Sequence, residues 1–115
     1  MELTERRDGN VVALGAAGRI DHKSAEAFLK ALEPYLSACS DTGTAIVLDM
    51  GGIDYISSVG LRSLLMATKR TSAQKGKIAV AAMQPSVGEV FRISQFDRIL
   101  PVYDTVAAAT AALQR

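Results

Sequence analysis

Two adjacent serines, Ser57 and Ser58, are the side chains of this sequence best placed to do chemistry. They follow a short apolar step, 53–56, and precede apolar residues at helical spacing, so they mark a change from strand to helix. A serine at the start of a helix can accept a hydrogen bond from a free backbone N–H group, which accounts for one serine but not for two followed by Gly60.

The only histidine, His22, raises a different possibility. A nucleophile–base–acid triad could be written with Ser58, His22 and either Asp21 or Asp49. The chain lacks the G-x-S-x-G turn that would expose such a serine, and a histidine next to an aspartate is weak evidence. We therefore expect no enzyme, no catalytic residue and an exposed His22.

Metal and cofactor sites are not indicated. One histidine and one cysteine cannot form any usual zinc site. The pair Gly51-Gly52 lacks both the GK[ST] of a phosphate-binding loop and the spaced glycines of a dinucleotide fold. We expect these glycines, with Asp49, to form a turn that needs positive φ.

Length and composition favour one globular domain over residues 1–115, because 49% of the residues are apolar. The net charge is +1 and no basic block is present, so we expect no direct nucleic-acid partner. No apolar run approaches membrane-spanning length, and the single Cys39 indicates a reducing compartment. These features predict a cytoplasmic protein without a membrane partner.

The alternation of apolar runs with helical spacing predicts an α/β fold of order ββαβαβαβα, a mixed β-sheet with helices packed against it. Asp8-Gly9-Asn10 predicts a hairpin turn between the first two strands, and Gly15 and Gly18 indicate either a bulge in the second strand or a close backbone approach there. Pro34 should bend the first helix or split it into two pieces before Cys39. The expected strands are 3–7, 11–20, 44–50, 77–82 and 99–102, and the expected helices are 25–39, 57–73, one that starts after Pro85-Ser86, and 106–113.

The segment IVLDMGGIDYISSVGLRSLL, residues 46–65, resembles the signature of the STAS domain as it occurs in bacterial anti-sigma-factor antagonists (anti-anti-sigma factors). GRIDHKSAEAF, residues 18–28, resembles the second strand and the following helix start of that family. The resemblance covers essentially the whole chain, and the order of elements agrees with it. It implies a partner-switching regulator of transcription rather than a catalyst.

What the resemblance implies for the serines is a phosphorylation switch. The family's phosphorylated serine corresponds to Ser58, and its Gly-Leu pair to Gly60 and Leu61. The phosphate would be added by a partner that is both anti-sigma factor and serine kinase, and removed by a serine phosphatase. Only the unphosphorylated form would bind the anti-sigma factor. Ser57 stands where many members have aspartate, and it is the second choice for the acceptor.

The second helix and the loop before the first helix would form the partner surface. A helical projection places Leu61, Leu64, Leu65 and Thr68 inward, and Val59, Arg62, Ser63, Met66 and Arg70 outward. The resemblance implies that Asp21 and His22 lie near the same surface, in kinase docking or in contact with the nucleotide site. The expected partner-binding residues are Asp21, His22, Ser57, Val59, Gly60, Arg62, Ser63 and Met66.

The missing aspartate at position 57 keeps a second hypothesis open. A STAS module that is never phosphorylated could bind a small ligand, or serve as a subunit of a transporter or of a stressosome-like assembly.

Overall fold

The chain begins with an antiparallel hairpin. In the computed structural model, which describes residues 1–115, strand β1 (Thr4–Asp8) pairs with strand β2 (Val11–Ile20) across the predicted turn. Gly9 in that turn has φ 62°, a left-handed conformation that glycine adopts at little cost. The hairpin prediction is confirmed.

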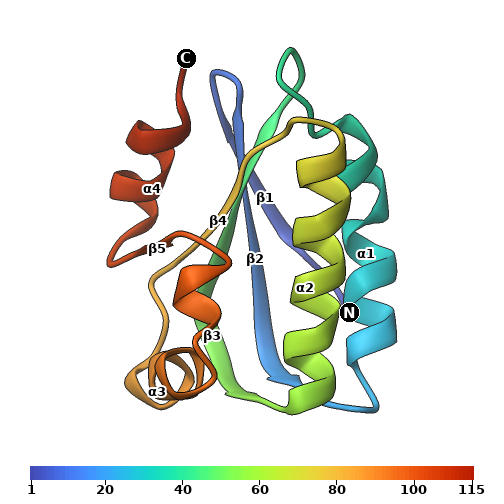
Figure 1. Cartoon of the computed structure of the whole chain (residues 1–115), viewed down its shortest axis with the longest axis vertical. Helices are drawn as coiled ribbons and strands as arrows, with labels where there is room; N and C mark the ends of the chain where they lie inside the picture. Colours follow the sequence, from blue (N-terminus) through green and yellow to red (C-terminus); the bar gives the residue numbers. More distant parts are fainter.

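Three further strands extend the sheet in parallel, giving the spatial order β1-β2-β3-β4-β5. The short strand β5 (Val102–Tyr103) lies at the edge of the sheet and begins only after Pro101, so the predicted strand 99–102 starts too early. The predicted order of strands and helices is confirmed (Figure 1). The remaining elements are β3 (Ala45–Ile56), β4 (Ile78–Ala81), β5 (Val102–Tyr103), α1 (Ala25–Ala38), α2 (Ser58–Ala73), α3 (Pro85–Ile93), the 3-10 turn η1 (Phe96–Arg98) and α4 (Val106–Leu113).

The two faces of the sheet bury different kinds of side chain. Helices α1, α2 and α3 supply Phe28, Leu64 and Phe91 to a core built on large aliphatic residues of the strands. The opposite face carries mostly alanine and valine and is covered by α4 (Figure 1). Because strand side chains alternate between faces, the small residues let α4 lie close to the sheet.

Helix α1 is one uninterrupted helix, not the two pieces that Pro34 allowed us to expect. Pro34 is exposed, so the carbonyl group that loses its helical hydrogen bond faces water, which can satisfy it. The buried stripe Phe28, Leu32 and Leu36 holds the helix on the sheet on both sides of the proline. The helix ends at Cys39, which is buried.

The predicted turn at Gly51-Gly52 is wrong, because β3 continues through both glycines to Ile56. Neither glycine has positive φ. A side chain at Gly52 would lie 2.8 Å from the carbonyl oxygen of Ala16 on β2, so this glycine serves close strand packing. The β2–β3 register shifts after Gly15 and after Gly18, but the extra residue lies on β3 each time and not on β2 as predicted.

Helix α2 buries Leu61 and Leu64 as predicted, but the rest of its buried face consists of small residues. Its buried residues include Gly60, Ser63, Ala67 and Thr71, whereas Leu65 and Thr68 are only half-buried. Small residues at this spacing let the helix approach its neighbours closely. Ser63, expected on the outward face, is 5% exposed and donates a hydrogen bond to the Gly60 carbonyl.

The same close packing predicts opposite effects for two helical glycines. A Cβ at Gly60 would lie 2.5 Å from the Ile20 carbonyl oxygen and 2.8 Å from Ile56 Cγ1, whereas a Cβ at Gly88 of α3 would meet nothing within 4 Å. Gly60→Ala should lower the free energy of unfolding by about 1–3 kcal/mol, because the clash exceeds the gain in helix propensity. Gly88→Ala should raise it by about 0.5–1 kcal/mol. Urea unfolding of both variants checks this, and equal stabilisation would contradict the packing role of Gly60.

Candidate functional site

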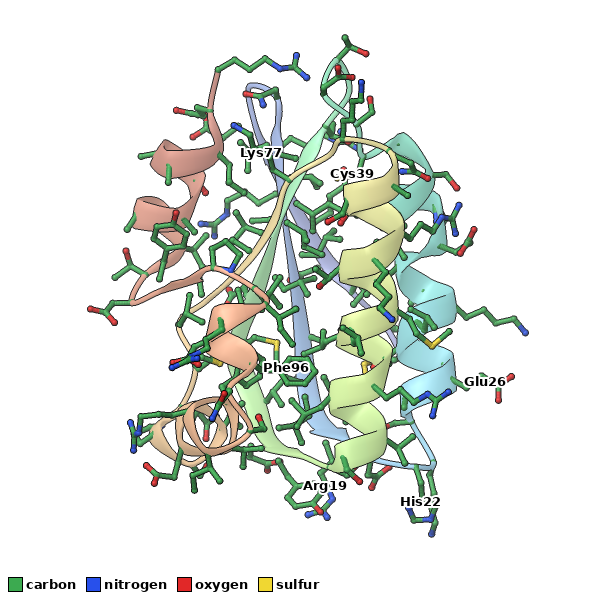
Figure 2. The ribbon with its side chains drawn as sticks, in the orientation of Figure 1. Arg19, His22, Glu26, Cys39, Lys77 and Phe96 are labelled. Atoms are coloured by element: carbon green, nitrogen blue, oxygen red, sulfur yellow. The ribbon has the colours of Figure 1, made fainter.

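The candidate site lies where the long strands β2 and β3 end and the helices α1 and α2 begin. The Ser57 N–H donates to the Ile20 carbonyl at 2.9 Å, which joins the β3–α2 junction to the end of β2. Arg19 and His22 lie at this end of the molecule with their side chains directed outward (Figure 2). The carboxyl ends of parallel strands are the usual place for a binding site in an α/β fold.

The two serines have different roles in the structure. Ser57 is the N-cap of α2, and its Oγ accepts a hydrogen bond from the Gly60 N–H at 3.1 Å. Ser58 is the first helical residue and is exposed, and its hydroxyl makes no hydrogen bond within the protein. The hydroxyl available to an outside enzyme is therefore that of Ser58.

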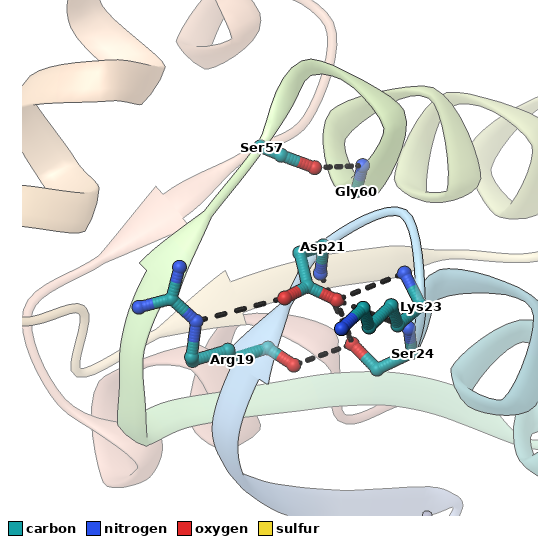
Figure 3. A network of polar contacts seen from close by, with 6 residues as sticks. All are labelled: Arg19, Asp21, Lys23, Ser24, Ser57 and Gly60. Atoms are coloured by element: carbon teal, nitrogen blue, oxygen red, sulfur yellow. Dashed lines mark hydrogen bonds and ion pairs between the residues drawn. The ribbon is translucent and has the colours of Figure 1, made fainter.

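Asp21 organises the loop between β2 and α1. Its Oδ1 accepts hydrogen bonds from the Lys23 N–H at 3.0 Å and the Ser24 N–H at 3.1 Å, while its Oδ2 lies 3.6 Å from Arg19 Nε (Figure 3). The bond from the Lys23 N–H does most to hold the pKa of Asp21 below its usual value; partial desolvation opposes it, and Ser24 and Arg19 add to it.

Ser24 is the N-cap residue of α1, but its side chain makes no capping hydrogen bond to the helix. Its hydroxyl donates to the Arg19 carbonyl at 2.6 Å and lies 3.2 Å from Asp21 Oδ1. The Asp21 N–H in turn donates to Ser24 Oγ at 3.0 Å. These hydrogen bonds fix the conformation of the β2–α1 loop, so Asp21 stabilises the predicted partner surface as well as forming part of it.

Arg19 and Tyr55 form a pair that our sequence reasoning missed. They are register partners on β2 and β3, and the Arg19 guanidinium carbon lies 4.1 Å from the centre of the Tyr55 ring. Arg19 lies two residues before Asp21, and Tyr55 lies two residues before Ser57. This equal spacing was the sequence signal that could have predicted the pair, because neighbouring parallel strands bring equivalent positions together.

The structure does not assemble the triad. His22 is exposed and makes no hydrogen bond with Ser58 or with Asp21, whose carboxylate is engaged by its own loop. Asp49 lies on β3, where its Oδ1 accepts from the Gly51 N–H. No group of three or more histidine, cysteine, aspartate or glutamate side chains is placed to bind a metal ion.

Part of the predicted outward face of α2 is exposed in the structure. Val59 is 46% exposed and Met66 51%, and Arg62 lies exposed between them. Ser63 and Gly60 are corrections to the predicted partner surface, because both are buried in packing contacts. No helix in the structure is long and apolar enough to cross a lipid bilayer; the longest, α2, has 16 residues.

Comparison with known proteins decides the family. The STAS domain model matches residues 3–109. The chain belongs to the STAS domain family. The match includes residues 18–28 and 46–65, so the family resemblance of these two segments is confirmed.

Individual relatives of this STAS domain agree with the assignment. A Bordetella bronchiseptica protein, provisionally named anti-sigma factor antagonist BtrV, is 39% identical over 116 residues, which cover 99% of this chain and 96% of that protein. A Thermotoga maritima protein described as an anti-sigma factor antagonist has TM-score 0.87 and 23% identity, covering 98% and 95% of the two chains. Phosphorylated SpoIIAA of Bacillus has TM-score 0.69 and 16% identity, covering 98% and 100%; these two structures show the shared fold.

The lowered pKa of Asp21 predicts how this loop responds to acid. Stability from the ionised carboxylate is present above the unfolded-state pKa and is lost as pH falls through the lower folded-state pKa. Asp21→Asn should therefore reduce the free energy of unfolding at pH 7, and its difference from wild type should shrink at acid pH. Urea unfolding from pH 7 to pH 3 measures this, with Asp41→Asn in the exposed α1–β3 loop as control. A difference that is independent of pH would contradict the role of the ionised group.

Proposed function

We propose that this STAS protein is an anti-sigma factor antagonist that binds a kinase-type anti-sigma factor and is switched off by phosphorylation of Ser58. The observation that carries the proposal is the free, exposed Ser58 hydroxyl beside a Ser57 hydroxyl already engaged as the N-cap. The name of BtrV, 39% identical over nearly the whole chain, supports the antagonist role. SpoIIAA, of the same fold and known in a phosphorylated form, supports phosphorylation as the kind of control.

The position of Ser58 suits a phosphoryl group. At the start of a helix the free N–H groups and the dipole favour negative charge, so the fold can accept a group of about −1.5 to −2 charge. Arg62 lies one turn further along α2 and is exposed, which allows a charge-assisted contact with the phosphate. Phosphorylation would thus change the docking surface and leave the core intact.

The partners follow from this chemistry. The anti-sigma factor would contact the surface around Ser58, which includes Val59, Arg62, Met66, His22 and the Asp21 loop. It would transfer the γ-phosphoryl group of a nucleoside triphosphate to the Ser58 hydroxyl oxygen and release the nucleoside diphosphate. A serine phosphatase would hydrolyse the phosphate ester, release inorganic phosphate and restore the binding form. We place this exchange in the cytoplasm, where a sigma factor and its regulators act.

Intact-mass analysis of the protein from its own cells tests the switch. A species heavier by one phosphoryl group should appear, disappear after serine phosphatase treatment and be absent from Ser58→Ala. Ser57→Ala is the matched control and should still be phosphorylated, because the proposed acceptor, Ser58, is unchanged in this variant. A heavy form that survives Ser58→Ala but not Ser57→Ala would move the acceptor by one residue. A heavy form absent under every growth condition would favour the unphosphorylated STAS module instead.

Arg62 should contribute to partner binding without supporting the fold. Arg62→Ala should weaken binding of the anti-sigma factor in a calorimetric titration and leave the melting temperature unchanged, because Arg62 is exposed and makes no ion pair within the protein. Lys69→Ala, two turns further along the same helix and also exposed, is the control. Equal affinities for wild type and Arg62→Ala would remove Arg62 from the interface.

A further inference from the structure

We propose that Arg19 is a specificity-determining contact of the docking surface, a preoriented cation that receives a carboxylate of the anti-sigma factor. The inference rests on the proposed function and adds the chemistry of the partner. Arg19 stacks on the Tyr55 ring at 4.1 Å, its Nε faces Asp21 Oδ2 at 3.6 Å, and its side chain is 60% exposed. It lies beside the β3–α2 junction, because the next residue, Ile20, receives the hydrogen bond from Ser57.

A backbone irregularity places Arg19 over the ring. Gly18 has φ 98°, and the β2–β3 register shifts between Gly18 and Arg19. A Cβ at Gly18 would meet nothing within 4 Å, so the glycine is explained by its conformation and not by packing. The extra residue of this bulge is Asp54 on β3, because Gly18 pairs with Ile53 and Arg19 pairs with Tyr55. The shift places the Tyr55 ring beside the Arg19 guanidinium.

Most hydrogen-bond donors of the Arg19 guanidinium have no partner within the protein. The guanidinium has five N–H donors, of which only the Nε–H faces a protein carboxylate, and the two terminal nitrogens have no partner in Figure 3. Asp21 does not depend on Arg19 for its hydrogen bonds, since the Lys23 and Ser24 N–H groups already occupy Oδ1. The pair therefore orients Arg19 while leaving its planar end free for a two-pronged bond to a carboxylate.

The free donors of Arg19 call for an acidic group on the partner. Arg19, Lys23 and Arg62 are exposed on the end of β2, the β2–α1 loop and the first turns of α2. The loop-bound Asp21, Asp54 and Glu26 in the first turn of α1 balance these three charges, so the unpaired guanidinium N–H groups, and not an excess of cations, set the chemistry. Tyr55, Val59 and Met66 add exposed apolar area of the kind found in interface cores. A carboxylate on the facing surface of the anti-sigma factor would accept those N–H groups.

An acidic partner surface would also explain why phosphorylation of Ser58 prevents docking. A phosphoryl group on Ser58 adds negative charge to the surface that docks on those carboxylates. Like charges brought together at an interface oppose docking strongly. Phosphorylation would thus reverse the electrostatic attraction to which Arg19 contributes.

Titration of the purified anti-sigma factor with wild type, Arg19→Gln and Arg19→Glu tests the inference. We expect Kd to rise about tenfold for Arg19→Gln and further for Arg19→Glu, since a buried interface charge is lost and then reversed. The dependence of Kd on NaCl should also become shallower for Arg19→Gln. Arg6→Gln is the matched control with unchanged Kd, because Arg6 is exposed on β1 opposite Ala13, toward the other end of β2. Melting temperatures check that each variant is folded.

Two further comparisons distinguish the contact made by Arg19 from the orienting role of the Tyr55 ring. Tyr55→Phe keeps the ring and should bind like wild type, whereas Tyr55→Leu should weaken binding, and by less when Arg19 is already glutamine. Lysine in place of the facing partner carboxylate should restore the binding of Arg19→Glu. Failure of the wild type to bind would overturn the proposed function itself. Binding by wild type with an unchanged Kd for Arg19→Gln would overturn only the role of Arg19, as would a slower phosphoryl transfer at unchanged Kd.

Discussion

The contact between the last residue of β2 and the first turn of α2 is the constraint on which the site depends. The Ile20 carbonyl accepts the Ser57 N–H and lies 2.5 Å from the place that a Gly60 side chain would occupy. Only a residue without a side chain lets the helix begin this close to the strand. The contact fixes Ser58 next to the Asp21 loop before any partner arrives, so little of the surface needs to be ordered on binding.

The irregular pairing of β2 and β3 has a second consequence for the site. Regular pairing of two parallel strands would carry one register along their whole length, but here the register shifts twice. The glycines Gly15, Gly18 and Gly52 permit the shifts, and the second shift aligns Arg19 with Tyr55. The stacked pair is thus a product of backbone geometry more than of side-chain attraction, which at an exposed site is worth about 0.5–1 kcal/mol.

The sequence was sufficient for the order of the elements, because apolar alternation and helical spacing are local properties. It was insufficient where one residue type serves two purposes. Glycine suits both turns and close packing, so Gly51-Gly52 was taken for a turn although β3 runs through it. Small residues are equally ambiguous on a helix: Ser63 looks like a surface residue, yet it is buried because its neighbours come close.

The same limit applies to the site. Ser58 and Asp21 were predicted as site residues because they lie in segments that resemble the STAS family, and the family is confirmed by the match over residues 3–109. Neither Arg19 nor Tyr55 carries such a signal alone, because their pairing depends on a register that bulges alter. The roles of the two serines also needed the structure, since either could have capped the helix.

In the proposed switch, a helix start that tolerates a phosphoryl group confines the effect of phosphorylation to the partner surface. A phosphate that disrupted α2 would expose the core, including Leu61 and Leu64, and would favour aggregation over a reversible change. A phosphate held by free N–H groups leaves the core untouched and alters only the charge presented to the partner. Recognition then depends on whether the facing surface is acidic, and Arg19, oriented by Tyr55 and Asp21 with its terminal nitrogens unpaired, is the residue of this surface best suited to bind a carboxylate there.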